Sequence, residues 1–233
     1  MELLPAAGEV LIEGDEHHYL FRVRRLAVGD AVVVTDATGR EADARVLSVD
    51  ATRARLSIQG VPRDAMRRAP RITVLQSLIK GERMDWCIEK LAECGADEIV
   101  LVAAARSVVK LEPQRAESRR ARLDAMARAA ARQSQQPVPE VRGPFAIASA
   151  LADVSADVRL VCHPQARESP LRAPAHAREI AILVGPEGGL APEELEAALA
   201  HGFAPVSLGA GVLRAETAGP VACAAIRLGA VKS

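Results

Sequence analysis

Aromatic residues are scarce in this chain of 233 residues, where they make up 2% of the sequence. Hydrophobic residues nevertheless reach 49%, so aliphatic side chains and alanine must build the core. Acidic and basic residues balance at 30 each. The protein as a whole therefore has no net positive charge that would attract nucleic acid. Any binding of RNA must therefore use local basic patches.

Cysteine is also rare, and its spacing does not indicate a metal site. The four cysteines are scattered and form no Cys-x-x-Cys pair, which argues against zinc. No charged and apolar leader opens the sequence, and no apolar run reaches the roughly 18 residues that span a bilayer. We therefore expect a cytoplasmic protein with reduced thiols, no metal and no membrane partner.

The chain divides into two parts with different sequence patterns. Short β-type runs separated by turns come first, at 31–35, 45–49 and 54–58, with the spacing of a small β-barrel. A basic stretch from Pro62 to Pro70 follows and has the composition of a linker. We expect one domain at residues 1–69, barrel and linker together, and a second at residues 70–233.

The second part alternates apolar runs with segments of helical period, which indicates an α/β fold with a largely parallel sheet. The expected strands are 72–79, 98–102, 158–162, 180–184 and 206–208. The expected helices are 84–94, 115–133, 192–201 and a last one, capped by Thr217, that ends near Leu228.

Two glycine-bearing loops follow strands of this second part. Gly185-Pro186-Glu187-Gly188-Gly189 comes after the strand 180–184, and Leu208–Ala218, with Arg214 and Glu216, comes after 206–208. Ligands of open α/β sheets bind beyond the carboxyl ends of strands. The spacing is neither GxGxxG nor a P-loop. A plain tight turn and a solvated Arg–Glu pair remain alternatives, but two such loops together favour a functional site.

Arginines gather in two places that suit phosphate. Arg22, Arg24 and Arg25 follow His17-His18-Tyr19, and the segment 115–132 has six arginines against two acids. A surface helix also carries such charges for solubility alone, so contact with RNA stays one of two alternatives.

At the two glycine loops the sequence resembles the RsmE family, bacterial enzymes of the SPOUT class that methylate N3 of a uridine in 16S ribosomal RNA. The resembling segments run along nearly the whole chain: His17–His18, Val23–Asp30, Lys80–Asp85, Lys90–Ala96, Arg106–Val109, Gly185–Gly189 and Leu213–Ala218. The last two are the most specific, and their order and separation also fit the family.

The resemblance implies a SPOUT α/β trefoil-knot methyltransferase domain after a PUA-like RNA-binding β-barrel, assembled as a homodimer. It implies S-adenosylmethionine as cofactor and 16S ribosomal RNA of the small ribosomal subunit as partner. The implied catalytic residues are Arg214 and Glu216. The implied RNA-binding residues are Arg22, Arg24, Arg25 and Arg106. The implied cofactor-binding residues are Leu183, Gly185, Pro186, Glu187, Gly188, Gly189, Leu208, Gly209, Leu213, Thr217 and Ala218.

Three departures from the family pattern accompany the resemblance. Gln135-Gln136 stands after Gln133-Ser134 where the family has Gly-Arg, Gly211 replaces an Arg, and Ala215 replaces a Thr. Two other functions stay open: methylation of another ribosomal or transfer RNA site, and a catalytically silent RNA-binding assembly factor.

Overall fold

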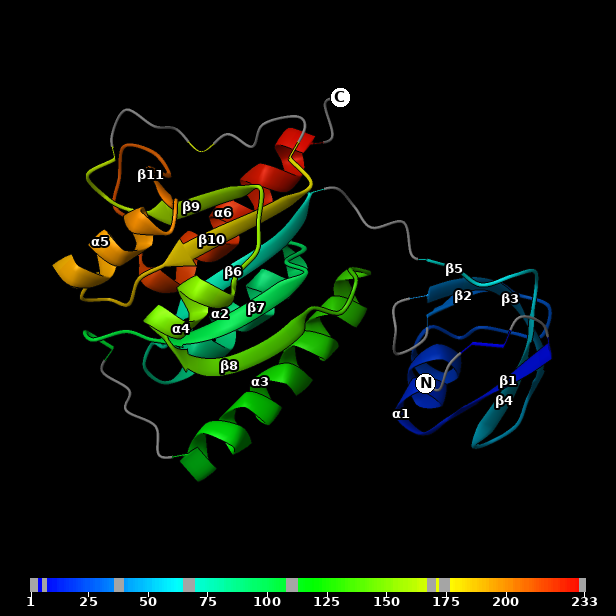
Figure 1. The fold of residues 1–233 in the computed structure, drawn as a ribbon. Coiled ribbons are helices and arrows are strands. Elements are labelled where there is room, and N and C mark those ends of the chain that lie inside the picture. The colour runs from blue at the N-terminus through cyan, green and yellow to red at the C-terminus, as the bar shows by residue number, and fades with distance from the viewer. Residues whose placement is uncertain are drawn as a thin grey trace. The chain divides into compact units, whose positions relative to one another are not determined.

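The chain folds into two compact units, Met1–Arg67 and Arg68–Ser233, drawn in Figure 1. The computed structural model describes residues 4–5, 8–35, 40–64, 70–107, 113–166, 171 and 177–230. The expected domain boundary between residues 69 and 70 borders residues 65–69, which lie outside the described residues, so that boundary stays a prediction.

The first unit is built on an antiparallel sheet with the strand order β1-β4-β3-β2, and β5 pairs with β3. The strands are β1 (Gly8–Glu13), β2 (Ala31–Thr35), β3 (Arg40–Val49), β4 (Arg53–Ile58) and β5 (Arg63–Asp64). Their alternate residues, such as Ala54, Leu56 and Ile58 of β4, face the core. Two helical turns that the sequence did not predict lie between β1 and β2, namely α1 (Gly14–His17) and the π-helix η1 (His18–Val23).

The second unit is a parallel six-stranded sheet with the order β11-β9-β10-β6-β7-β8, which confirms the expected α/β fold. Its strands are β6 (Arg71–Ser77), β7 (Glu98–Ala103), β8 (Glu140–Ala146), β9 (Val158–Cys162), β10 (Glu179–Val184) and β11 (Ala204–Val206). Its helices are α2 (Glu82–Glu93), α3 (Pro113–Ser134), α4 (Ile147–Asp153), α5 (Pro192–Ala200) and α6 (Ala215–Ala230). No helix among the described residues is long and apolar enough to cross a membrane.

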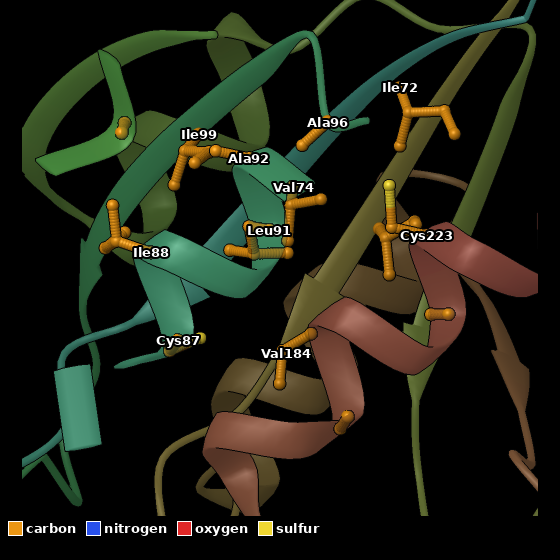
Figure 2. Close-up of a cluster of buried hydrophobic side chains, with 14 of the residues drawn as sticks. Ile72, Val74, Cys87, Ile88, Leu91, Ala92, Ala96, Ile99, Val184 and Cys223 are labelled. Atoms are coloured by element: carbon orange, nitrogen blue, oxygen red, sulfur yellow. The ribbon is translucent and has the colours of Figure 1, made fainter. Parts of the chain in front are cut away.

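Helices cover both faces of this sheet, as Figure 1 shows. Helices α2, α3 and α6 close one core, and α4 and α5 close the other. Strand β10 serves both, because Ile182 packs into the first core and Leu183 into the second. Figure 2 shows part of the first core, where Leu91 of α2 lies near Val74 of β6. Burial on both faces explains why these strands are continuously apolar in sequence.

Parallel strands place all their carboxyl ends at one edge of the sheet. The segments that follow β6, β7, β9, β10 and β11 therefore gather there, although they lie far apart in the sequence. This edge is where open α/β folds bind ligands.

Candidate active site

A pocket opens where β9 and β11 end. Its walls are formed by Cys162, His163, Pro164, Val206, Ser207, Leu208, Gly211, Val212, Leu213 and Ala218. Of the predicted cofactor residues, Leu208, Leu213 and Ala218 belong to this lining. Burial raises the pKa of the Cys162 thiol to about 12, so this thiol is uncharged at neutral pH. Among the described residues, this lining holds no Lys or Arg, which suits an apolar or cationic ligand better than a phosphate.

The loop Gly185–Gly189 is a tight turn that depends on its glycines. The Gly189 N–H donates to the Pro186 carbonyl at 2.9 Å, and Gly189 has a φ of +70°, which other residues adopt at a cost. A Cβ on Gly185 would come within 3.2 Å of the Leu190 backbone nitrogen. This loop is not part of the pocket lining above, so its contact with a cofactor stays a prediction.

Neighbouring loops hold this turn in place. The Lys80 N–H, after β6, donates to Glu187 Oε1 at 3.3 Å. After β7, Arg106 donates through Nη1 to the Gly188 carbonyl at 3.2 Å. The Ala105 N–H donates at 2.7 Å to Oε1 of the buried Glu194 in α5. Arg106 therefore has a contact within the site itself, and its predicted contact with RNA remains a prediction.

The start of α6 differs from the sequence prediction. The helix begins at Ala215, and the Arg214 carbonyl accepts the N–H groups of Thr217 and Ala218 at 2.9 and 3.0 Å. Thr217 thus lies in the first turn, and its predicted role as helix cap is wrong. The earlier start places Glu216 inside the helix and Arg214 just before it.

Glu216 is the unusual group of this site. It is 7% exposed, and its Oε1 lies 3.9 Å from Nη1 of Arg214 and 3.8 Å from Nε of Arg83. Its Oε2 is buried and has no hydrogen-bond partner among the described residues. A buried carboxylate oxygen without a donor is costly, which marks Glu216 as a candidate functional group of this site.

The predicted pair Arg214 and Glu216 is therefore brought together, while sequence reasoning missed Arg83 as the third member. It also missed Cys162 and His163 in the pocket. Arg83 is in the first turn of α2, Cys162 is the last residue of β9, and His163 follows it. All three therefore lie at the carboxyl edge of the sheet. That position was the signal that could have identified them.

The predicted RNA-binding arginines of the first unit are exposed. Arg22 lies in η1, and Arg24 and Arg25 follow it. Arg25 has a φ of +56°, which is uncommon for a residue with a side chain. Contact with RNA at these residues stays a prediction.

Two arginines of α3, Arg119 and Arg122, contact other parts of the second unit. Arg119 donates to the Ile79 carbonyl at 3.2 Å, and Arg122 pairs with Asp85 of α2 through both carboxylate oxygens, at 2.5 and 2.8 Å. The side chain of Arg115 lies outside the described residues. These contacts give Arg119 and Arg122 a role in packing, and contact of this helix with RNA stays a prediction.

Comparison with known proteins finds matches for both units. Residues 67–227 match the model of the RNA methyltransferase domain family, and residues 12–59 match that of the RNA methyltransferase PUA domain. Ribosomal RNA small subunit methyltransferase E of Mycobacterium bovis is 36% identical over 235 residues, covering 97% of this chain and 89% of that protein. The Bacillus subtilis protein of the same name is 28% identical and covers 92% and 88%.

A solved structure extends the match to the fold. The crystal structure of a ribosomal RNA small subunit methyltransferase E from Neisseria gonorrhoeae, bound to S-adenosyl methionine, superposes with a TM-score of 0.80. The two sequences are 28% identical, and the match covers 96% of this chain and 93% of that one.

Proposed function

Because the chain belongs to the RNA methyltransferase family, together with the small-subunit ribosomal RNA methyltransferases E, we propose that it methylates N3 of a uridine in 16S ribosomal RNA, using S-adenosylmethionine. The chain is thus an RNA methyltransferase with a PUA domain, as its sequence predicted. The N3 position and the small-subunit substrate are parts of the proposal, and this substrate places the enzyme in the cytoplasm.

The pocket has the chemistry that this cofactor requires. Its apolar walls suit the faces of an adenine ring, and the part of the lining that the structure describes has no Lys or Arg that would repel a positively charged sulfonium. A Cβ on Gly209 or Gly211 would meet no atom within 4 Å, so the second loop leaves open space. Leu208, Leu213 and Ala218 would hold the cofactor, with the Gly185–Gly189 loop beside them. When bound, S-adenosylmethionine supplies a methyl group that the sulfonium has already activated.

The chain itself must supply the proton transfer and the charge stabilisation. N3 of uracil belongs to a weakly acidic imide, which becomes nucleophilic when it loses its proton. Glu216 Oε2 accepts that proton, since this buried oxygen lacks a partner among the described residues. Arg214, whose side chain is 74% exposed, turns to the uracil oxygens and stabilises the anion.

One observation carries the proposal: Glu216, whose Oε2 has no hydrogen-bond partner among the described residues, is in the first turn of α6, the same turn whose Ala218 lines the pocket. Modified uridines in 16S RNA should be mapped in cells with and without the gene, and purified protein should restore the mark on small subunits. Loss of a methyl group from transfer RNA instead would favour the first alternative. Binding of RNA without binding of S-adenosylmethionine would favour the silent assembly factor.

Gly188→Val should weaken S-adenosylmethionine binding by roughly tenfold while the fold persists. A Cβ at this position would lie 3.3 Å from the Arg106 Cβ, so the branched side chain must displace Arg106 and the loop that it holds. Calorimetric titration measures the affinity, and Gly202→Val is the matched control, since a Cβ there meets no atom within 4 Å and its own positive φ of +80° makes it the more strained change. Equal affinity in the Gly188 variant and the wild type would show that this loop does not shape the cofactor site.

We also propose that the enzyme is a homodimer whose contact uses the second unit. Val221 and Leu228 are 38% and 71% exposed and lie seven residues apart on α6, so they share one face of that helix. Sedimentation at micromolar concentration should give twice the chain mass of 24.7 kDa, and Leu228→Lys should shift the species towards the monomer. A wild type that sediments as a monomer would contradict the proposal.

A further inference from the structure

Two guanidinium groups from different elements flank the Glu216 carboxylate. Arg83 is in the first turn of α2, and Arg214 directly precedes α6. Their nitrogens lie 3.8 and 3.9 Å from the same oxygen, Oε1, which is too far for a hydrogen bond. Both cations therefore act on Glu216 through charge.

Two uncharged groups, from α2 and β6, also lie on this side of α6. Cys87 lies one turn after Arg83 on the same side of α2 and is fully buried. Burial raises the pKa of the Cys87 thiol, and the Glu216 carboxylate raises it further, so the thiol stays protonated. From β6, the uncharged Gln76 approaches Gly219, one turn beyond Glu216 in α6. Arg83 and Arg214 are thus the cations that face this carboxylate among the described residues.

The two arginines differ in whether they stay beside the carboxylate during the reaction. In the proposed function Arg214 leaves Glu216 and turns to the uracil oxygens. A buried carboxylate that loses its neighbouring cation tends to bind a proton, and a protonated Glu216 is no longer able to accept the N3 proton. Arg83, whose side chain is 54% exposed, is on α2, which packs against α3, and the proposed function gives Arg83 no second task.

We propose that Arg83 is a positioning residue that keeps Glu216 ionised and oriented while Arg214 serves the substrate. This inference rests on the proposed function and adds to it a third side chain from the opposite end of the catalytic unit's sequence. Because Arg83 acts through the charge of Glu216, replacing Arg83 should change how the rate of methyl transfer depends on pH.

The test is single-turnover methyl transfer to small ribosomal subunits between pH 5 and 9, at saturating S-adenosylmethionine. Arg83→Gln should move the acidic limb of the rate profile up by about one pH unit, the lower end of the shift that a neighbouring opposite charge produces. The rate on the acidic limb then falls roughly tenfold, while the high-pH plateau stays near the wild-type value. Arg83→Lys keeps the charge and should follow the wild type.

A matched control removes an arginine of another helix. Arg128 pairs with Asp124 on the surface of α3, and Arg128→Gln should leave the profile unchanged. In a Glu216→Gln background, Arg83→Gln should cause no further shift, since the titrating group is gone. Calorimetry of each variant confirms that it is folded.

The outcomes separate this inference from the proposed function. An active wild type with an Arg83→Gln profile that superposes on it would overturn the role of Arg83 alone. A rate that falls equally at every pH, or an equal fall in Arg83→Lys, would also overturn it in favour of a structural role. A folded wild type that binds S-adenosylmethionine but methylates no small subunit would overturn the proposed function and this inference with it.

Discussion

Arg214→Ala should slow methyl transfer by roughly 10²-fold or more, the scale of losing one group that stabilises developing charge. The affinity for S-adenosylmethionine should stay nearly unchanged, because Arg214 is not part of the pocket lining, whereas its neighbours Val212 and Leu213 are. The fold should also tolerate the change, since the side chain is 74% exposed and makes one long contact, to Glu216. The loss should therefore appear in the chemical step.

Two further variants of the experiment separate charge from geometry. Arg214→Lys should rescue poorly, because a single ammonium does not reproduce the planar fork of a guanidinium. Raising the pH should partly restore Arg214→Ala, since more of the uracil is then already ionised. Single-turnover assays on small subunits measure the rate, and titration calorimetry measures cofactor affinity separately. An Arg214→Ala enzyme that loses cofactor binding but transfers methyl normally at saturation would make Arg214 a cofactor ligand.

The sequence predicted the buried strands well because their residues are constrained from both sides. Continuous apolar runs such as 180–184 and 158–162 became β10 and β9 with little change at their ends. Strand β8 was missed for the opposite reason. It is at the edge of the sheet, and it contains Gly143 and Pro144, which central strands exclude.

The short helix α4 was missed because of its length, although its alanines and leucine favour a helix. Its 7 residues make too few turns for a periodic pattern. Ile147, Ala150 and Leu151 become buried only against the face of the sheet that α5 also covers. The helix is stabilised by packing against the rest of the unit, which the local sequence does not show.

The candidate site was predictable only where it is contiguous in sequence. Arg214 and Glu216 share one loop and helix start, so a single motif contained both. Arg83 joins them through the parallel topology, which places the start of α2 beside the start of α6. For Arg106 the sequence indicated a different partner. The family resemblance implied contact with RNA, whereas in the structure Arg106 donates to the Gly188 carbonyl.

The second large effect concerns the opposite edge of the sheet, where the strands begin. Arg227 of α6 is largely buried, with a side chain 15% exposed. It donates through Nη1 to the Pro70 carbonyl at 2.6 Å and through Nη2 to the Gly95 carbonyl at 2.7 Å. Its Nη2 also pairs with Asp97 Oδ2 at 2.6 Å. One guanidinium thus fastens the last helix to the beginnings of β6 and β7.

Arg227→Met should lower the free energy of unfolding of the second unit by about 3 kcal/mol, because removing one partner leaves a buried charge and two carbonyls without their donor. Methionine retains the apolar length of the side chain, so lost packing contributes little. Arg128→Met is the matched control: its exposed pair with Asp124 should cost less than about 1 kcal/mol.

Urea unfolding followed by Trp86 fluorescence measures this difference, because Trp86 is the single tryptophan and lies on α2 of the second unit. Protein concentration must be equal for all variants, since a dimer gains apparent stability by mass action. The midpoint should fall while the slope m stays constant. Methyl transfer by the folded Arg227 variant should stay near the wild-type rate, because Arg227 contacts the amino ends of the strands and the proposed chemistry takes place at their carboxyl ends. An unchanged midpoint would mean that Asp97 and the two carbonyls find other donors when the guanidinium is removed.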